Sequence, residues 1–343
     1  MKQAEDFSPL RIIKKELKLL RPKEAFVIEA RFGLKDKPTT LAKIGRDMKL
    51  SRERVRQIEK EALKKLSINI VKNYQGEIGS IIEFFNESGG LIAKKDSAGK
   101  LLHSKYNKSE TESRALDLFI HLLPQTELIE RHNDLHDSWI LSDINKDDMV
   151  KILKSWANYL NQNKKPQKID LLIKKQPDSN KYKISFLLSL PKVSREIIET
   201  YTGELALSNW PEYNPKTVRD KIYYVLKKNQ NPIHFSEITR AIEQEEFDQK
   251  KVVTATVHNE LISDKRFVLV GRGIYALAEW GYKEGTVKDI IRKILNQAGG
   301  AMDLSDIYKE VLKQRMVRKN TVLINLQTQK IFKKIGNNKY ILA

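Results

Sequence analysis

Hydrophobic residues in the N-terminal part of the chain recur at helical spacing. The clearest apolar stripe has positions three or four residues apart, which predicts the buried face of one helix: Val55, Ile58, Ala62 and Leu66. Ser51 lies just before this stripe and suits a helix N-cap, as Thr40 does for a shorter helix before it. Residues 48–50 leave room only for a tight connection between these two helices. An earlier helix is expected to begin at Pro22 and to end at Gly33.

Polar residues lie on the other side of the helix that follows Ser51, which is the second helix of the pair. Positions i, i+1, i+4 and i+5 share a face, and here they are Arg52, Glu53, Arg56 and Gln57. This layout predicts a helix-turn-helix whose second helix presents its first residues to base edges in the major groove. Arginine can pair with guanine, glutamine with adenine, and glutamate can accept from cytosine. Expected phosphate contacts are Arg54, Lys43, Lys49, Lys60 and Lys64. The alternative is a solvated amphipathic helix of a bundle. The N-caps, the tight turn, the apolar stripe and the positive charge together favour the helix-turn-helix.

Two stretches of sequence carry a family resemblance. RPKEAFVIEARFGL, followed by TLAKIGRDMKLSRERVRQIEKEALKKL, resembles region 4 of the bacterial primary-type (sigma-70-type) sigma factors. The resemblance covers about residues 8–70, and we place the module at 1–72. It implies binding to the −35 promoter element and packing on the β flap of RNA polymerase. The positions that match the family's base and phosphate contacts are Arg52, Glu53, Arg54, Arg56 and Gln57. Nothing here resembles sigma region 2, so the chain is not expected to open a promoter alone.

The last part of the chain is an internal repeat. Residues 217–242 align with 286–311, and residues 256–278 align with 321–343, where 9 of 23 positions are identical without a gap. Similarity at a fixed period indicates repeated supersecondary units. Each unit reads as three helices followed by two short β runs around a tight turn, which is a winged helix.

Weaker copies precede these two. Strand-like endings recur around Leu141, Leu207, Leu277 and Leu342, at spacings of 66, 70 and 65 residues. We therefore expect four winged-helix-like units, at 76–144, 147–212, 216–280 and 285–343. The predicted fold class is mainly α, with an N-terminal helix-turn-helix followed by tandem winged-helix units of three helices plus a β-hairpin.

The third unit resembles the HARE-type winged helix. The segments TVRDKIYYVLKK, HFSEI and GRGIYALAEWGY carry this resemblance. The HARE-type domain is shared by the delta subunit of bacterial RNA polymerase, additional-sex-combs-like chromatin proteins and some restriction systems, so it implies the fold but leaves DNA and protein partners open.

On the third helix of that unit, Val253, Val257 and Leu261 are expected to face inward. Candidate secondary DNA contacts face outward there, and in the fourth unit their counterparts do so too: Lys250, Lys251, Thr254 and His258, then Arg318, Lys319 and Asn325. A solvated polar face fits these residues equally well.

The amino-acid composition indicates a polyanionic binding partner. The 343 residues carry a formal charge of +19, and residues 1–75 contribute 20 Lys/Arg and 10 Asp/Glu. The remaining +9 is expected to be spread thinly over the other modules. Such a surplus favours nucleic acid or another acidic partner, and the basic helix-turn-helix makes double-stranded DNA the leading one. No membrane or small-molecule partner is expected.

The absence of cysteine excludes disulfides, thiolate metal sites and a cysteine nucleophile. Apolar runs are too short for a membrane span. We expect a cytoplasmic, nucleoid-associated protein with no cofactor.

We find no catalytic constellation. Gly99-Lys100 fails the phosphate-loop pattern, because Lys94 occupies the first glycine position. Residues 131–137 contain a histidine and aspartate set with metal-compatible spacing, but we expect a wing loop without metal there. We therefore predict that the protein is not an enzyme.

Three functional hypotheses are compatible with these sequence features. The leading one is a sequence-specific transcription regulator that reads a −35-like element and contacts RNA polymerase. A non-catalytic adaptor that grips polymerase or another protein through its winged helices is the second. The third is the DNA-targeting subunit of a restriction or repair system, which would need a separate nuclease partner.

Overall fold

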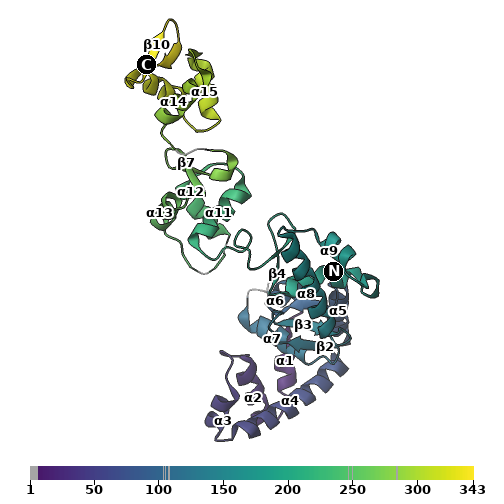
Figure 1. Ribbon diagram of the computed structural model, residues 1–343. Helices are drawn as coiled ribbons and strands as arrows, with labels where there is room; N and C mark the ends of the chain where they lie inside the picture. Colours follow the sequence, from purple (N-terminus) through teal and green to yellow (C-terminus); the bar gives the residue numbers. More distant parts are fainter. Residues whose placement is uncertain are drawn as a thin grey trace. The chain divides into compact units, whose positions relative to one another are not determined.

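A computed structural model describes residues 7–102, 104, 106, 109–245, 247–248, 250–282 and 285–343 (Figure 1). The chain divides into two compact units, Met1–Ser208 and Asn209–Ala343. Both are mainly helical and carry small antiparallel sheets, as the sequence pattern predicts.

The N-terminal helices begin and end at the predicted signals. They are α1 (Pro9–Leu17), α2 (Pro22–Phe32), α3 (Leu41–Met48) and α4 (Arg52–Asn73). Pro22 occupies the first turn of α2, and Gly33 ends it in the left-handed conformation, with φ of 65°. Thr40 and Ser51 both cap their helices through the side chain, which confirms the two predicted N-caps. Helix α4, with 22 residues, is the longest of this group, and Figure 1 shows it lengthwise.

The next elements form a winged-helix-like module. They are α5 (Gln75–Glu87), β1 (Leu91–Ala93), α6 (Lys94–Leu101), α7 (Glu110–His121), β2 (Thr126–Ile129) and β3 (Ser138–Leu141). The three strands form one sheet in the order β1-β3-β2, with Leu128 opposite Trp139 and Ile92 opposite the same residue on the other side. The central strand is buried along its whole length.

This module shares a hydrophobic core with the helices before it. Ile13 of α1, Ile28 of α2, Leu66 of α4 and Phe119 of α7 are buried in one cluster. Polar contacts reinforce the junction, since the buried Glu112 accepts a hydrogen bond from Ser8 Oγ at 2.6 Å. Helix α7 is therefore held against α1 and cannot present its buried face elsewhere.

A second module of related design follows. Its elements are α8 (Lys146–Asn163), α9 (Ile169–Lys175), a 3-10 turn (Ser179–Lys181), α10 (Ile184–Ser189), a 3-10 helix (Leu190–Val193), β4 (Ile197–Glu199) and β5 (Leu205–Leu207). An isolated bridge between Gln167 and Leu205 takes the place of a third strand. The loop of the preceding hairpin joins this module through the backbone, because His136 N donates to Val193 O at 2.8 Å and Arg195 N donates to Asp134 O at 2.9 Å.

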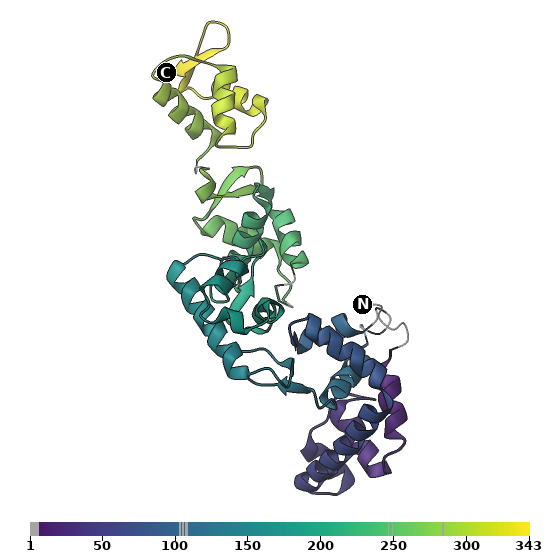
Figure 2. The same ribbon diagram turned by 90° about the vertical axis from the view of Figure 1, so that its right-hand side faces the viewer.

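The last two modules have matching elements (Figure 2). The third contains α11 (Val218–Asn229), β6 (Ile233–His234), α12 (Phe235–Gln244), α13 (Thr254–Ser263), β7 (Phe267–Gly271), β8 (Ile274–Leu277) and a 3-10 turn (Ala278–Trp280). The fourth contains α14 (Val287–Ala298), β9 (Met302–Asp303), α15 (Leu304–Leu312), α16 (Lys319–Thr328), β10 (Phe332–Ile335) and β11 (Lys339–Leu342). Their sheets have the orders β6-β8-β7 and β10-β11-β9, which is the arrangement of the first module.

The aligned positions of the repeat occupy equivalent core sites. Leu261 and Leu326 lie on α13 and α16, and both are buried. Tyr275 and Tyr340 are buried on the last strand of each hairpin. Some of the identities between the repeats thus lie at core positions, whereas others, such as Lys265 and Lys330, are exposed.

Candidate DNA-binding surface

Helices α3 and α4 form the predicted helix-turn-helix. Thr40 Oγ1 accepts from Lys43 N at 3.3 Å, and Ser51 Oγ accepts from Arg54 N at 3.1 Å. Between the helices Lys49 takes up a left-handed conformation, with φ of 56°. These local bonds fix where α4 begins and thereby which residues lie in its first turns.

A small hydrophobic cluster sets the angle between these helices. Val27 of α2, Ile44 of α3, and Val55 and Ile58 of α4 are buried together. Gly45 lets the turn close, since a Cβ atom at this position would lie 2.7 Å from the Leu50 carbonyl oxygen. Packing therefore places α4 by the same stripe that the sequence indicates.

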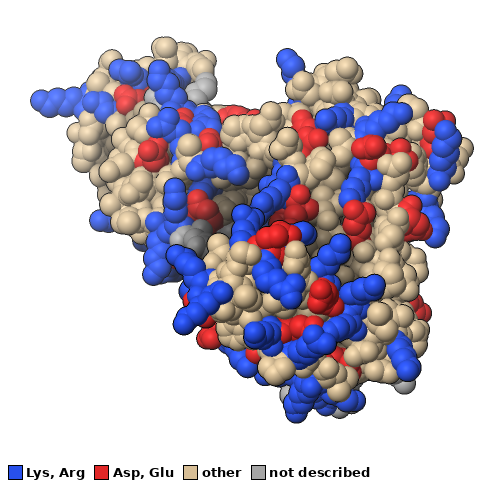
Figure 3. Space-filling view, turned by 90° about the horizontal axis from the view of Figure 1, so that it is seen from below, with Lys and Arg blue, Asp and Glu red and all other residues tan. Residues whose placement is uncertain are grey.

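The predicted readout residues lie together on the exposed side of α4. They are Arg52, Glu53, Arg56 and Gln57, and all four are exposed, as is Arg54 between them, which is an expected phosphate contact. The expected phosphate contacts Lys43, Lys49, Lys60 and Lys64 are exposed as well. Figure 3 is seen from below Figure 1, and it shows many blue Lys and Arg side chains interspersed with red acidic ones among other residues. This surface can offer hydrogen-bond donors and acceptors to a polyanion.

Two side-chain pairs organise the readout residues. Arg56 Nη2 and Nε donate to the two carboxylate oxygens of Glu53 at 2.7 and 2.8 Å. Arg54 Nη1 donates to Gln57 Oε1 at 3.0 Å. The hydrogen bond from Arg56 lowers the pKa of Glu53, so this carboxylate is ionised at neutral pH. The surface is thus partly organised before any ligand binds.

Ion pairs that the sequence pattern does not predict hold α2 against α4. Lys65 Nζ of α4 lies 2.6 Å from Glu24 Oε1 of α2, and the Glu24 side chain is only 5% exposed. Arg31 of α2 similarly pairs with Glu59 of α4 at 3.3 Å. The position of Glu24 was the available sequence signal for a structural role. It is the third residue of a helix that begins with proline, where a carboxylate can accept a hydrogen bond from the backbone N–H of the residue before the helix. Arg21 N does donate to Glu24 Oε2, at 3.1 Å.

The Glu24 pair predicts a pH-dependent contribution to stability. The hydrogen bond from Lys65 lowers the pKa of Glu24 below its ordinary value. A depressed folded-state pKa stabilises the fold above the unfolded pKa of about 4.3, and this stability is lost as the pH falls through the folded value. Glu24→Gln should therefore lower the free energy of unfolding of this region by about 1 kcal/mol at pH 7 and by less below about pH 4.

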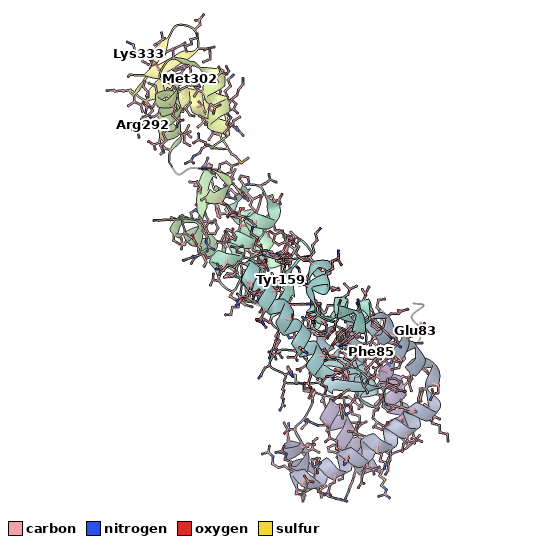
Figure 4. All side chains as sticks on the ribbon, turned by 45° about the vertical axis from the view of Figure 1, so that its right-hand side comes forward. Glu83, Phe85, Tyr159, Arg292, Met302 and Lys333 are labelled. Atoms are coloured by element: carbon pink, nitrogen blue, oxygen red, sulfur yellow. The ribbon has the colours of Figure 1, made fainter. Side chains whose placement is uncertain are left out.

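Unfolding of both proteins followed at several pH values checks this expectation. Glu83→Gln is a matched control, since Glu83 is exposed on α5 (Figure 4) and forms no ion pair within the described residues. A stability difference between Glu24→Gln and the unsubstituted chain that stays constant from pH 7 to pH 3 would contradict the linkage.

The secondary candidates are placed differently from the prediction. Val253 is 64% exposed and does not face inward, because α13 begins only at Thr254 and Val252 is buried instead. Lys250 and Lys251 precede the helix and do not lie on it. His258 is partly buried, with its ring centroid 4.8 Å from that of Phe235.

The fourth-module counterparts are more open. Arg318 and Lys319 are exposed at the start of α16. Asn325 is partly buried and its side-chain amide donates to Thr321 O at 2.8 Å.

The residues with metal-compatible spacing have other partners. His132 Nδ1 accepts from Asp134 N at 3.1 Å, while Asp134 pairs with Lys154 at 3.3 Å. Asp137 accepts from Arg131 N at 3.1 Å, and burial lowers the pKa of His136. This stretch is the loop between β2 and β3, as expected, and the described residues hold no cluster of three His, Cys, Asp or Glu able to bind a metal ion. Among the described helices, none is long and apolar enough to cross a membrane.

Comparison with known proteins identifies the N-terminal helices. Residues 17–67 match the family model for sigma-70, region 4. The RNA polymerase sigma-C factor of Nostoc sp. strain PCC 7120 is 52% identical over 60 residues, which is 16% of this chain and 14% of the relative. The RNA polymerase sigma factor SigA of Clostridium acetobutylicum is 41% identical over 66 residues, 18% of each chain. The match thus spans less than a fifth of these curated relatives. Residues 17–67 are thus similar to region 4 of sigma-70 factors, and these similarities do not cover the other modules of the chain.

Proposed function

We propose that this protein is a sequence-specific transcription regulator that binds double-stranded DNA at a −35-like promoter element. The observation that carries the proposal is the exposed set of readout residues on α4, Arg52 to Gln57, within the part that matches sigma region 4. Arg52, Arg56, Gln57 and Glu53 would meet base edges. Arg54, Lys43, Lys49 and Lys60 would meet phosphates.

The winged-helix-like modules add a second element to the proposal. The third module, with its buried Tyr275 and Leu277 on the last strand and Trp280 packed beside the hairpin, is proposed to be HARE-type. We propose that the region 4 domain or these modules contact RNA polymerase, with the β flap as the specific target. The chain would act without catalysis and without opening a promoter itself, and it would be found with the nucleoid in the cytoplasm.

A binding experiment with the full chain tests the DNA proposal. A short duplex with a −35-like element should bind more tightly than a scrambled duplex, and affinity should fall steeply with salt. With about six phosphates neutralised, the slope of log affinity against log salt should be near −5. A flat salt response, or equal binding of both duplexes, would argue for the adaptor that grips a protein.

Polymerase capture distinguishes the adaptor directly. If Arg56→Ala loses preference at the one or two base positions it reads while the chain still retains purified RNA polymerase in a pull-down, the polymerase contact is independent of DNA reading. Failure of the unsubstituted chain to retain polymerase would contradict the proposed polymerase contact and would leave the DNA proposal standing.

A further inference from the structure

The positive charge outside the region 4 domain is concentrated in one module. Residues 285–343 contain 12 Lys/Arg and 4 Asp/Glu, a net charge of +8, whereas residues 216–280 contain 11 and 9, a net charge of +2. Residues 76–144 are acidic, with 7 Lys/Arg and 12 Asp/Glu. The expectation of a thin, even spread was therefore wrong, and the chain carries basic modules near both of its ends.

The first two winged-helix-like modules have no comparable basic surface on their third helix and hairpin, although the second has exposed lysines around α9: Lys164, Lys165, Lys168, Lys174 and Lys175. In the first, the third helix α7 is packed into the shared core, and the hairpin loop is bonded to residues 193–195. In the second, α10 has six residues, Ile184–Ser189, with no charged side chain. Its hairpin, residues 197–207, contains no lysine or arginine.

The third module pairs about half of its cations with its own acids, while Arg240, Lys250, Lys251, Lys265 and Arg272 are exposed and form no ion pair within the described residues. Lys221 is buried and bonded to Asp248 at 2.8 Å. Further pairs join cations of α11, and Arg266 just before β7, to acids of the same module: Arg219 with Glu260, Lys227 with Glu279, Lys228 with Glu245, and Arg266 with Asp220 and Asp264. Cations held in this way are poorly placed to bind phosphate.

The fourth module differs in that its hairpin carries unpaired lysines. Lys333 and Lys334 of β10 and Lys339 of β11 are exposed, and Figure 4 labels Lys333 on this hairpin. The register pairs Lys333 with Ile341 and Ile335 with Lys339, so Lys333 and Lys339 lie diagonally on one face. Lys339 lies opposite Asp303 of β9 in the register, but no ion pair joins them.

Further exposed cations lie at the start of α16 and between α16 and β10. Arg318, Lys319 and Lys330 are exposed, and among the described residues none of these three, nor the hairpin lysines, has a carboxylate oxygen within 4 Å. The ion pairs that this module does form lie on α14 and α15, each between residues three positions apart: Arg292 with Asp289, Lys309 with Asp306, and Lys313 with Glu310. The fourth module thus has a paired set of cations, Arg292, Lys309 and Lys313, and a free set on the hairpin and near α16.

We infer that the β10–β11 hairpin and the start of α16 form a second DNA-binding surface, which contacts the phosphate backbone of a duplex without reading its sequence. Lysine suits this task because its ammonium is a flexible point charge, whereas base reading favours planar bidentate groups. The choice of duplex DNA over an acidic protein rests on the proposed function of the region 4 domain, which brings a duplex to the same chain.

The test compares two triple variants of the full chain that lose the same charge. One is Lys333→Ala/Lys334→Ala/Lys339→Ala, in the hairpin. The matched control is Arg292→Ala/Lys309→Ala/Lys313→Ala, in the paired set. On a random-sequence duplex of about 20 base pairs, the hairpin variant should reduce the slope of log affinity against log salt by about 2 to 3, as expected for three lost phosphate contacts. The control should keep the original slope within about 0.5.

Several outcomes would overturn the inference. An unchanged slope in the hairpin variant excludes the surface, and an equal loss in the control shows that only net charge matters. If the hairpin binds an acidic protein in place of DNA, the hairpin variant should bind the duplex with the same affinity as the unsubstituted chain. Since all the replaced side chains are exposed, unfolding temperatures should be unaltered, and a lower value only for the hairpin variant would attribute its loss to folding and count against the inference.

The outcome is separable from the fate of the proposed function. Sequence preference is measured on paired duplexes, with and without the −35-like element, and depends on α4. The hairpin variant should weaken both duplexes by the same factor and leave their ratio intact. If the unsubstituted chain shows no sequence preference, the proposed function is contradicted. The salt slope on random DNA would still show whether the second surface binds DNA.

Discussion

Arg56→Ala should weaken binding to the preferred duplex by about 1–3 kcal/mol, which is roughly 5- to 150-fold. Arg56 is exposed on the second turn of α4, and its guanidinium is already oriented by both oxygens of Glu53. A planar guanidinium held in this way can make two parallel hydrogen bonds to one guanine, which a methyl group cannot replace. The loss should be confined to one or two base positions, measured by competition with duplexes that each carry a single base change.

A neighbouring lysine provides the control for that measurement. Lys60 is exposed one turn beyond Arg56 on the same helix. If Lys60 contacts phosphate, Lys60→Ala should weaken all duplexes by a similar factor and reduce the salt slope by about 1. A uniform loss for Arg56→Ala as well would contradict its assignment to base reading.

Gly45→Val is expected to unfold the helix-turn-helix locally and to abolish sequence preference with it. Even a Cβ atom at this position would lie 2.7 Å from the Leu50 carbonyl oxygen, and Leu50 N is bonded back to Gly45 O at 2.8 Å. The obstacle is backbone, so relief requires the turn to open. Overpacking of this kind costs about 1–3 kcal/mol. Amide hydrogen exchange in α3 and in the first turns of α4 measures the effect where it arises.

Gly79→Ala is the matched control, because Gly79 lies within α5 with nothing within 4 Å of a built Cβ atom. Replacing a helical glycine by alanine should stabilise that helix by about 0.5–1 kcal/mol. Protection of α3 that is unchanged by Gly45→Val would show that the turn tolerates a side chain and that the close approach is unimportant.

Local sequence signals predicted the helix-turn-helix well. The caps Thr40 and Ser51 act on backbone groups three residues away, and the stripe from Val55 to Leu66 repeats within one helix. The repeat was equally visible, because the same core positions must be filled twice, as Tyr275 and Tyr340 show.

Interactions between distant segments were not predictable from these patterns. The bond between Ser8 and Glu112 spans 104 positions, and nothing in the sequence near Ser8 indicates a buried glutamate as its partner. Val253 fits an apolar helical stripe by spacing, yet it precedes the helix and is exposed. Charge counts show that the fourth module is more basic than the third, but they do not show which cations are paired, since pairing depends on which elements the fold brings together.

The central claim is that the exposed residues of α4 read DNA sequence, and selection from a random duplex pool tests it most directly. The full chain and its Gln57→Ala variant are each used to enrich bound duplexes, which are then sequenced. We predict that the unsubstituted chain enriches a −35-like element and that Gln57→Ala loses preference at one position, where adenine is favoured, while the others are kept. Enrichment of no sequence, or an identical element recovered by both proteins, would contradict the account.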